Sequence, residues 1–143
     1  MYNMKRTEVI DLIFLLSKNQ TGFETLESRL SGIGKVELLA MILECGVMPE
    51  VFHHDSSEEK LWAKYSDILL AKSLEFLGLK SNVIRVRGDS ADVFAESTKY
   101  KIVGDAKTFR LSRTAKNQKD FKVEALDSWR RSNDYAIAWE TVQ

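Results

Sequence analysis

Two short stretches, Ser90-Ala91-Asp92-Val93 and Asp105-Ala106-Lys107, decide how this chain of 143 residues is interpreted. Their aspartates are thirteen positions apart, about the length of one β-hairpin. Two carboxylates can hold a hard divalent cation, and a nearby amine can orient or activate a water molecule. The pattern therefore favours a metal-dependent phosphodiesterase.

The length and composition indicate one globular domain with a sizeable core, since 44% of the residues are hydrophobic and 29% are charged. The single cysteine, Cys45, excludes an internal disulfide and suits a reducing compartment such as the cytoplasm, where we expect it as a buried thiol. Neither a secretory signal nor a membrane-spanning run is visible, so no membrane partner is expected.

A net charge of zero conceals a segregation of charge along the chain. Residues 1–98 carry a net charge of −4, residues 99–131 carry +6 and residues 132–143 carry −2. A local positive potential can attract a polyanion such as nucleic acid even when the total charge is zero. The alternative is that these lysines and arginines form an ordinary solvated face.

The periodicity of apolar residues divides the chain into an N-terminal helical region (residues 1–50) and a second region (residues 51–143), which we expect to form one compact domain. Helical stripes recur in the first region, and a longer helix begins at Ser56, where Ser56 and Glu59 fit a capping box, and ends at Gly78. Strands are predicted over 83–86, 91–95, 101–107 and 135–139, and a helix capped by Thr114 over 115–131. The sequence therefore predicts a mixed α/β fold in the order α-β-β-β-α-β, preceded by helices.

The two aspartates are predicted to face each other, because a turn at 97–100 pairs residues whose numbers sum to roughly 197. Like charges placed opposite each other are destabilising unless a cation lies between them. Lys107 lies two residues after Asp105 and therefore leaves the same face of the strand. The alternatives are an ion pair between Asp105 and Lys107 and a turn role for Asp92.

Asp92 and Asp105-Ala106-Lys107, with a helix before and after, resemble the PD-(D/E)xK nuclease core. Four stretches extend the likeness to the HindIII-like family of type II restriction endonucleases: residues 54–61, 67–73, 89–93 and 105–123. The resemblance spans about residues 49–135, and Ser90-Ala91 stands where the motif name has its proline. Restriction enzymes of this type are considerably longer, so three interpretations stay open: a fragment of a longer enzyme, a truncated gene product or a reduced core.

The resemblance implies an enzyme, a Mg²⁺-dependent endonuclease that cleaves double-stranded DNA at a short palindrome as a homodimer. Asp92 and Asp105 would then be metal ligands, and Lys107 would position the attacking water. A third acid often comes from the first core helix in this superfamily. Asp67 is the first candidate for that ligand, and Glu59 is the second, although helix capping is a sufficient role for Glu59.

Basic and amide side chains directly after Lys107 are candidates for contact with DNA. They are Arg110, Arg113, Lys116, Asn117, Gln118, Lys119 and Lys122. Amides can hydrogen-bond adenine, arginine or lysine can hydrogen-bond guanine, and a helix N-terminus favours phosphate. A solvated basic face is again the alternative.

Three other functions compete with a restriction endonuclease. One is a structure-specific or repair nuclease on the same core, and another is a truncated, non-catalytic DNA-binding module. The third is a helical interaction protein whose carboxylates only form ion pairs and bind no divalent cation.

Overall fold

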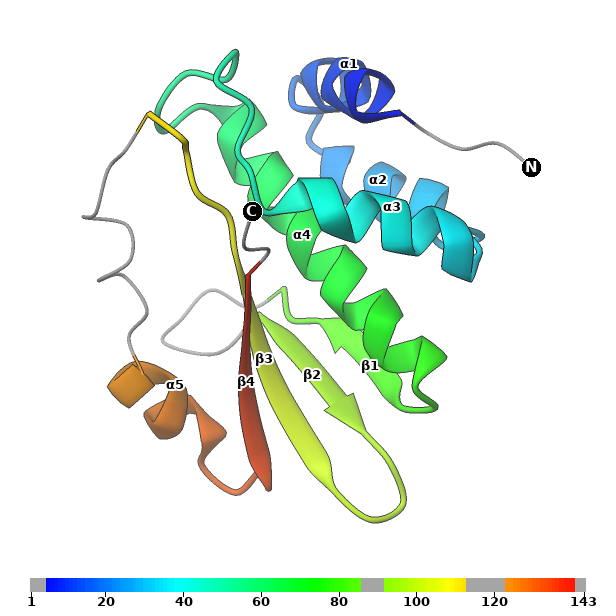
Figure 1. Ribbon diagram of the computed structural model, residues 1–143, viewed down its shortest axis with the longest axis vertical. Helices are drawn as coiled ribbons and strands as arrows, with labels where there is room; N and C mark the ends of the chain where they lie inside the picture. Colours follow the sequence, from blue (N-terminus) through cyan, green and yellow to red (C-terminus); the bar gives the residue numbers. More distant parts are fainter. Residues whose placement is uncertain (1–4, 86–91, 113–122, 141–143) are drawn as a thin grey trace.

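The computed structural model describes residues 5–85, 92–112 and 123–140 (Figure 1). Its helices are α1 (Arg6–Leu16), α2 (Gly22–Leu30), α3 (Lys35–Cys45), α4 (Ser57–Phe76) and α5 (Val123–Arg130). Its strands are β1 (Lys80–Val83), β2 (Val93–Glu96), β3 (Lys101–Lys107) and β4 (Tyr135–Glu140). From α4 onward, the order is the predicted α-β-β-β-α-β.

The four strands form one mixed sheet in the order β1-β2-β3-β4. β2 pairs antiparallel with both β1 and β3, whereas β4 runs parallel to β3. Val93 pairs with Gly104 and Phe94 with Val103, so the numbers of paired residues sum to 197, as predicted. Asp92, directly before β2, is therefore level with Asp105 in β3.

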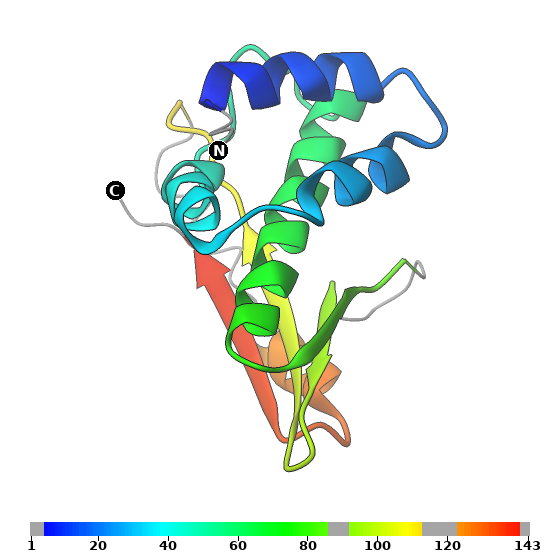
Figure 2. The ribbon, with the colours of Figure 1, turned by 90° about the vertical axis from the view of Figure 1, so that its right-hand side faces the viewer.

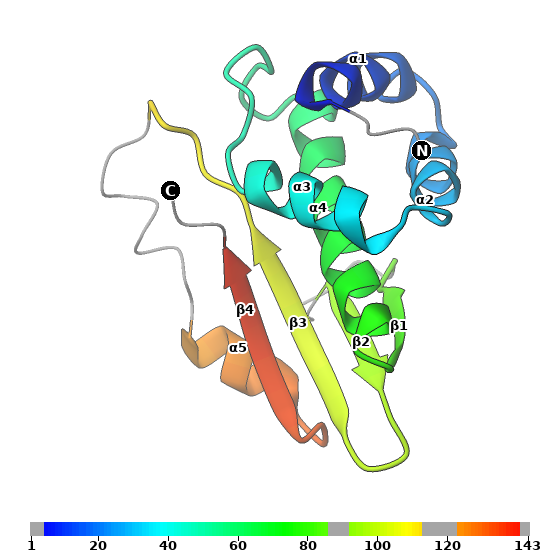
Figure 3. The same cartoon turned by 45° about the vertical axis from the view of Figure 1, so that its right-hand side comes forward.

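Helix α4 organises the molecule, because it packs on the sheet with one side and on the other helices with the opposite side. In Figure 2, α1, α2 and α3 surround its first half, while its second half lies along the sheet. In Figure 3, α4 lies in front of the sheet and α5 lies behind β4. This central position explains why buried residues occur all along α4 rather than on one stripe.

The two ends of α4 follow from local sequence. The Ser56 hydroxyl accepts a hydrogen bond from the Glu59 backbone N–H at 3.1 Å, which satisfies one donor that the helix leaves unpaired. After the helix, Gly78 adopts a φ of 94°, a left-handed conformation that costs glycine little. The predicted start and stop of this helix are confirmed.

The N-terminal helices share one hydrophobic core with the sheet. Ile13, Leu26 and Leu30 belong to the same buried cluster as Leu69 of α4 and Val93 of β2. No helix in the part of the chain that the structure describes is long and apolar enough to cross a membrane.

Trp62 connects α4 to the end of α3. Its indole N–H donates to the Cys45 carbonyl at 3.0 Å, and the Arg6 guanidinium stacks over its ring at 5.0 Å. Cys45 is buried, as expected, and its thiol lies 3.4 Å from the Ile42 carbonyl oxygen. These contacts attach the helical region to α4 by hydrogen bonds as well as by apolar packing.

Three predicted boundaries differ from the structure. The strand predicted over 91–95 is found at Val93–Glu96, and Ala91 lies outside the described residues. The first strand was predicted over 83–86, but the structure describes it at Lys80–Val83, because its pairing with β2 begins at Lys80. Val86, the last residue of the predicted strand, lies outside the described residues. The helix predicted over 115–131 is described from Val123 onward, and its expected cap, Thr114, lies outside the described residues. The strands predicted over 101–107 and 135–139 are confirmed as β3 and β4.

Replacing Leu69 by alanine should destabilise the protein by about 2–5 kcal/mol, because it opens a cavity under a fully buried side chain at the centre of the shared core. Leu77→Ala is a matched control, since this leucine is 76% exposed and its loss should cost about 0.5 kcal/mol or less. Urea unfolding followed by circular dichroism and by tryptophan fluorescence measures both. Two separate transitions, with Leu69→Ala affecting only one of them, would contradict a shared core.

Candidate metal centre and active site

Three aspartates from three segments of the chain converge at one place. Asp67 comes from the middle of α4, Asp92 directly precedes β2, and Asp105 lies near the end of β3. One carboxylate oxygen from each lies within 4.8 Å of the others. Asp67 and Asp105 are buried, whereas the Asp92 side chain is partly exposed. The cluster therefore opens to solvent on the side of Asp92.

Two lysines neutralise part of this negative charge. The Lys107 ammonium lies 2.7 Å from Asp105 Oδ2, so the Asp-x-Lys motif does form an ion pair. The Lys64 ammonium, one turn before Asp67 on α4, lies 3.4 Å from Asp67 Oδ2 and 3.2 Å from Asp92 Oδ1. Three carboxylates thus share two ammonium groups.

The two buried carboxylates, Asp67 and Asp105, bind protons more tightly than ordinary aspartates. Burial, followed by the nearby Asp92 carboxylate, raises the pKa of Asp67 to about 8, and Lys64 opposes this shift only in part. Burial and Asp92 likewise raise the pKa of Asp105 to about 6 against the opposing effect of Lys107. For Lys64, burial works to lower the pKa, but Asp67 and Asp92 outweigh it and the pKa is raised. The charged cluster is therefore under electrostatic strain near neutral pH.

The donor atoms of the cluster suit a hard divalent cation. All are carboxylate oxygens, which is the ligand type that Mg²⁺ and Ca²⁺ prefer. Asp67 Oδ1 is buried and has no hydrogen-bond partner among the described residues. A buried polar atom of this kind is costly unless something fills its place. The cluster therefore fits a divalent cation in three respects: its negative charge, its carboxylate ligands and the unpaired oxygen of Asp67.

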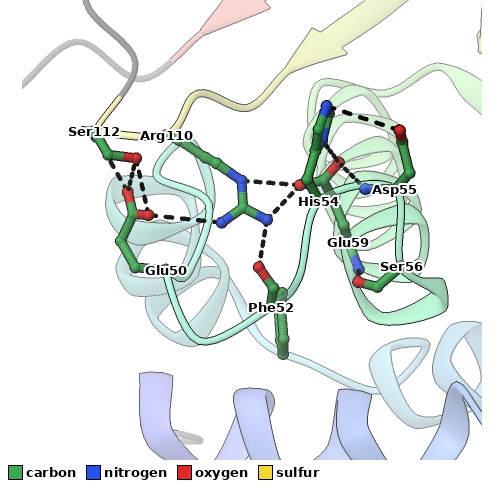
Figure 4. A network of polar contacts seen from close by, with 8 residues as sticks. All are labelled: Glu50, Phe52, His54, Asp55, Ser56, Glu59, Arg110 and Ser112. Atoms are coloured by element: carbon green, nitrogen blue, oxygen red, sulfur yellow. Dashed lines mark hydrogen bonds and ion pairs between the residues drawn. The ribbon is translucent and has the colours of Figure 1, made fainter.

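Arg110, three residues after Lys107, forms a second polar network (Figure 4). Its guanidinium donates two hydrogen bonds to Glu59 Oε2, one from Nε at 2.9 Å and one from Nη2. The Nη2 group also donates to the Phe52 carbonyl oxygen. Its Nη1 lies 3.6 Å from Glu50 Oε2, and Glu50 in turn accepts hydrogen bonds from Ser112. The network fastens the segment after β3 to the start of α4.

Backbone hydrogen bonds strengthen the same attachment. Phe109 donates its N–H to the Gly46 carbonyl at 2.8 Å, and its carbonyl accepts from the Met48 N–H at 2.8 Å. The segment that follows Lys107 is therefore held against the α3–α4 connection, and this holds Lys107 and Asp105 at a fixed position relative to Asp67.

The predicted site residues fall into three groups. Asp67, Asp92, Asp105 and Lys107 come together in one cluster. Glu59 lies instead in the Arg110 network, and Arg110 itself faces protein groups, with its side chain only 12% exposed. The other DNA-contact candidates lie outside the described residues, namely Arg113, Lys116, Asn117, Gln118, Lys119 and Lys122.

Lys64 was not predicted as a site residue. A signal for it was present in the sequence, since Lys64 and Asp67 are three residues apart and therefore adjacent on the surface of a helix. Its second contact, with Asp92, is 28 residues away in sequence and follows only from the packing of α4 on the sheet.

A mixed four-stranded sheet preceded by a long helix, with acidic side chains at the β2–β3 pair, is a restriction-endonuclease-like core. Residues 8–141 match the family described as HindIII restriction endonuclease, and the chain belongs to that family. It is 43% identical over 141 residues to the type II restriction enzyme HindIII of Haemophilus influenzae. This match covers 94% of the chain and 47% of the relative, so the chain spans about half the length of that curated relative.

Replacing Asp67 by asparagine should remove a pH dependence of stability. The pKa of Asp67 is raised to about 8 in the folded protein, whereas it is about 4 in the unfolded chain. The stability that this difference contributes is fully present below about pH 4 and is lost as the pH rises through about 8. In chelator at pH 8, Asp67→Asn should therefore be more stable than the wild type by about 1–3 kcal/mol, with little difference near pH 4. Urea unfolding at several pH values tests this, and parallel pH curves for the two proteins would contradict it.

Replacing Arg110 by methionine should destabilise the fold by about 1–3 kcal/mol, because it leaves the half-buried Glu59 carboxylate without its main partner. Arg130→Met is the control, since the Arg130–Asp127 pair is exposed and should contribute about 0.5 kcal/mol or less. A double-mutant cycle with Glu59→Gln measures the coupling by chemical denaturation. Additive effects of the two substitutions would show that the Arg110–Glu59 pair contributes nothing.

Proposed function

We propose that this chain carries the catalytic core of a Mg²⁺-dependent type II restriction endonuclease, which hydrolyses phosphodiester bonds of double-stranded DNA at a short specific site. The observation that carries the proposal is the convergence of Asp67, Asp92 and Asp105 beside Lys107 in a chain of the HindIII restriction endonuclease family. The name of the curated relative, a type II restriction enzyme, supports the same substrate class.

The proposed cofactor is Mg²⁺, held by Asp92, Asp105 and Asp67. Mg²⁺ uses a few carboxylates and keeps several waters, which suits a cluster of three carboxylates that is open on one side. When bound, it would supply charge stabilisation for the phosphate and a water of lowered pKa. Glu59 is not placed for this role, because it is engaged by Arg110.

The chain's own residues would act on the water and the phosphate. Lys107 extends from the end of β3 beside Asp105, and its ammonium is a hydrogen-bond donor that can position the attacking water. The same positive charge favours the additional negative charge that develops on the phosphate oxygens during attack. Asp105 limits the movement of Lys107 through their 2.7 Å ion pair, so the lysine is already oriented before substrate binds.

The proposed DNA-contact residues follow β3 in the sequence. They are Arg113, Lys116, Asn117, Gln118, Lys119 and Lys122, in the segment where positive charge is concentrated. Arg110 could reach DNA only by leaving Glu59, so we assign it to the attachment of this segment instead.

A short palindromic site is two-fold symmetric, which favours a homodimer with one catalytic core for each strand. The proposed location is the cytoplasm, whose reducing conditions suit the Cys45 thiol.

Asp105→Asn and Lys107→Met should each reduce DNA cleavage by at least about 100-fold, because one removes a metal ligand and the other removes the ammonium next to it. The assay incubates the 143-residue chain with long duplex DNA in Mg²⁺ or in chelator and separates the fragments on a gel. Discrete, Mg²⁺-dependent fragments that disappear in both variants support the proposal.

Other patterns of cleavage or binding would point to the competing functions. Cleavage of branched or nicked DNA without a preferred sequence would favour a structure-specific nuclease. Salt-sensitive binding without cleavage would favour a DNA-binding module. If the chain neither binds nor cleaves DNA, that result would contradict nuclease function for this chain.

A further inference from the structure

Lys64 occupies a special position among the lysines that the structure describes, because its ammonium contacts two of the three proposed metal ligands. It lies 3.4 Å from Asp67 Oδ2 and 3.2 Å from Asp92 Oδ1. These two aspartates belong to the cluster that would hold a cation. The Lys64 side chain is 37% exposed, so its stem has room to swing toward solvent.

Lys64 and Lys107 differ in what they contact. Among the described residues, Lys107 pairs with Asp105 alone, at 2.7 Å. Lys64 instead joins a carboxylate of α4 to a carboxylate beside β2, and so holds together two segments that repel each other by charge. An ammonium that bridges two carboxylates offsets the same repulsion that a bound metal would offset.

We propose that Lys64 is a resident counter-ion of the metal site, which holds Asp67 and Asp92 together in the metal-free protein and which a divalent cation must displace to bind. This inference rests on the proposed function, in that it takes the three aspartates to be the metal site. It assigns to Lys64 a positioning role that sets the affinity of the site for its cation.

The formal charges of the site support this assignment. When all three carboxylates are ionised, they and the two ammonium groups carry a net charge of −1, and a divalent cation changes this to +1. One phosphodiester carries one negative charge, so the metal-loaded site becomes neutral when DNA occupies it. Lys64 therefore disfavours metal binding in the absence of DNA and makes the metal-loaded site attractive to a phosphate.

The test compares three variants for binding of Mg²⁺, and separately of Mn²⁺, in the absence of DNA. Lys64→Met removes the charge and keeps a flexible stem, and Lys64→Arg keeps the charge. Lys72→Met is the matched control, because Lys72 lies on the same helix and forms the same kind of i, i+3 pair, with Glu75 at 3.0 Å. Isothermal calorimetry gives the affinity, and the metal-induced shift in melting temperature gives a second readout.

Lys64→Met should bind each cation roughly tenfold more tightly than the wild type, because a competing positive charge has been removed from the ligands. Without metal at pH 8, it should also melt at a lower temperature than the wild type and show a larger rise when metal is added. Lys64→Arg and Lys72→Met should bind like the wild type. If Lys64→Met fails to fold, Lys64→Gln removes the same charge with a polar side chain.

Equal or weaker metal binding by the neutral Lys64 variants, in a protein whose wild type binds metal, would overturn the role of Lys64 and leave the proposed function standing. If only the neutral variants bind metal, the inference is supported. If neither they nor the wild type binds, both the inference and the proposed metal site are wrong.

Discussion

Electrostatic repulsion among Asp67, Asp92 and Asp105 is the constraint that the rest of the structure has to satisfy. Three carboxylates within 4.8 Å of one another, two of them buried, cannot all be charged without a compensating cation. Lys64 and Lys107 supply two positive charges, which would leave the sum at −1 if all three carboxylates were ionised. The raised pKa values of Asp67 and Asp105 show the remaining strain. A fold that tolerates such a cluster gives up stability at a site whose charge the proposed divalent cation would neutralise.

The packing of the fold makes this arrangement rigid. Asp67 is fixed by α4, which is held between the N-terminal helices and the sheet, while Asp105 is fixed by a strand with partners on both sides. The Arg110 network and the Phe109 backbone bonds then connect the end of that strand to the start of α4. The N-terminal helices thereby contribute to the geometry of the candidate site without contributing a residue to the aspartate cluster.

Local signals in the sequence predicted much of this structure. Capping at Ser56, the stop at Gly78 and the hairpin register all depend on residues close in sequence, and all three are confirmed. The first strand was misplaced because its position is set by pairing with β2, which the run Val83–Val86 does not reveal. Likewise, the partners of Arg110 are 51 and 58 residues away, and Lys64 meets Asp92 across 28 residues. Contacts of this kind follow from tertiary packing, so periodicity and motif spacing could not predict them.

The most direct measurement is a crystal structure of the protein grown with Mn²⁺, with anomalous diffraction used to locate the metal. The expected result is an anomalous peak bounded by the carboxylates of Asp67, Asp92 and Asp105, with the Lys64 ammonium moved away from at least one of its two aspartate partners. A fully occupied Mn²⁺ at any other group of residues, or an aspartate cluster still bridged by Lys64 at saturating metal, would contradict it.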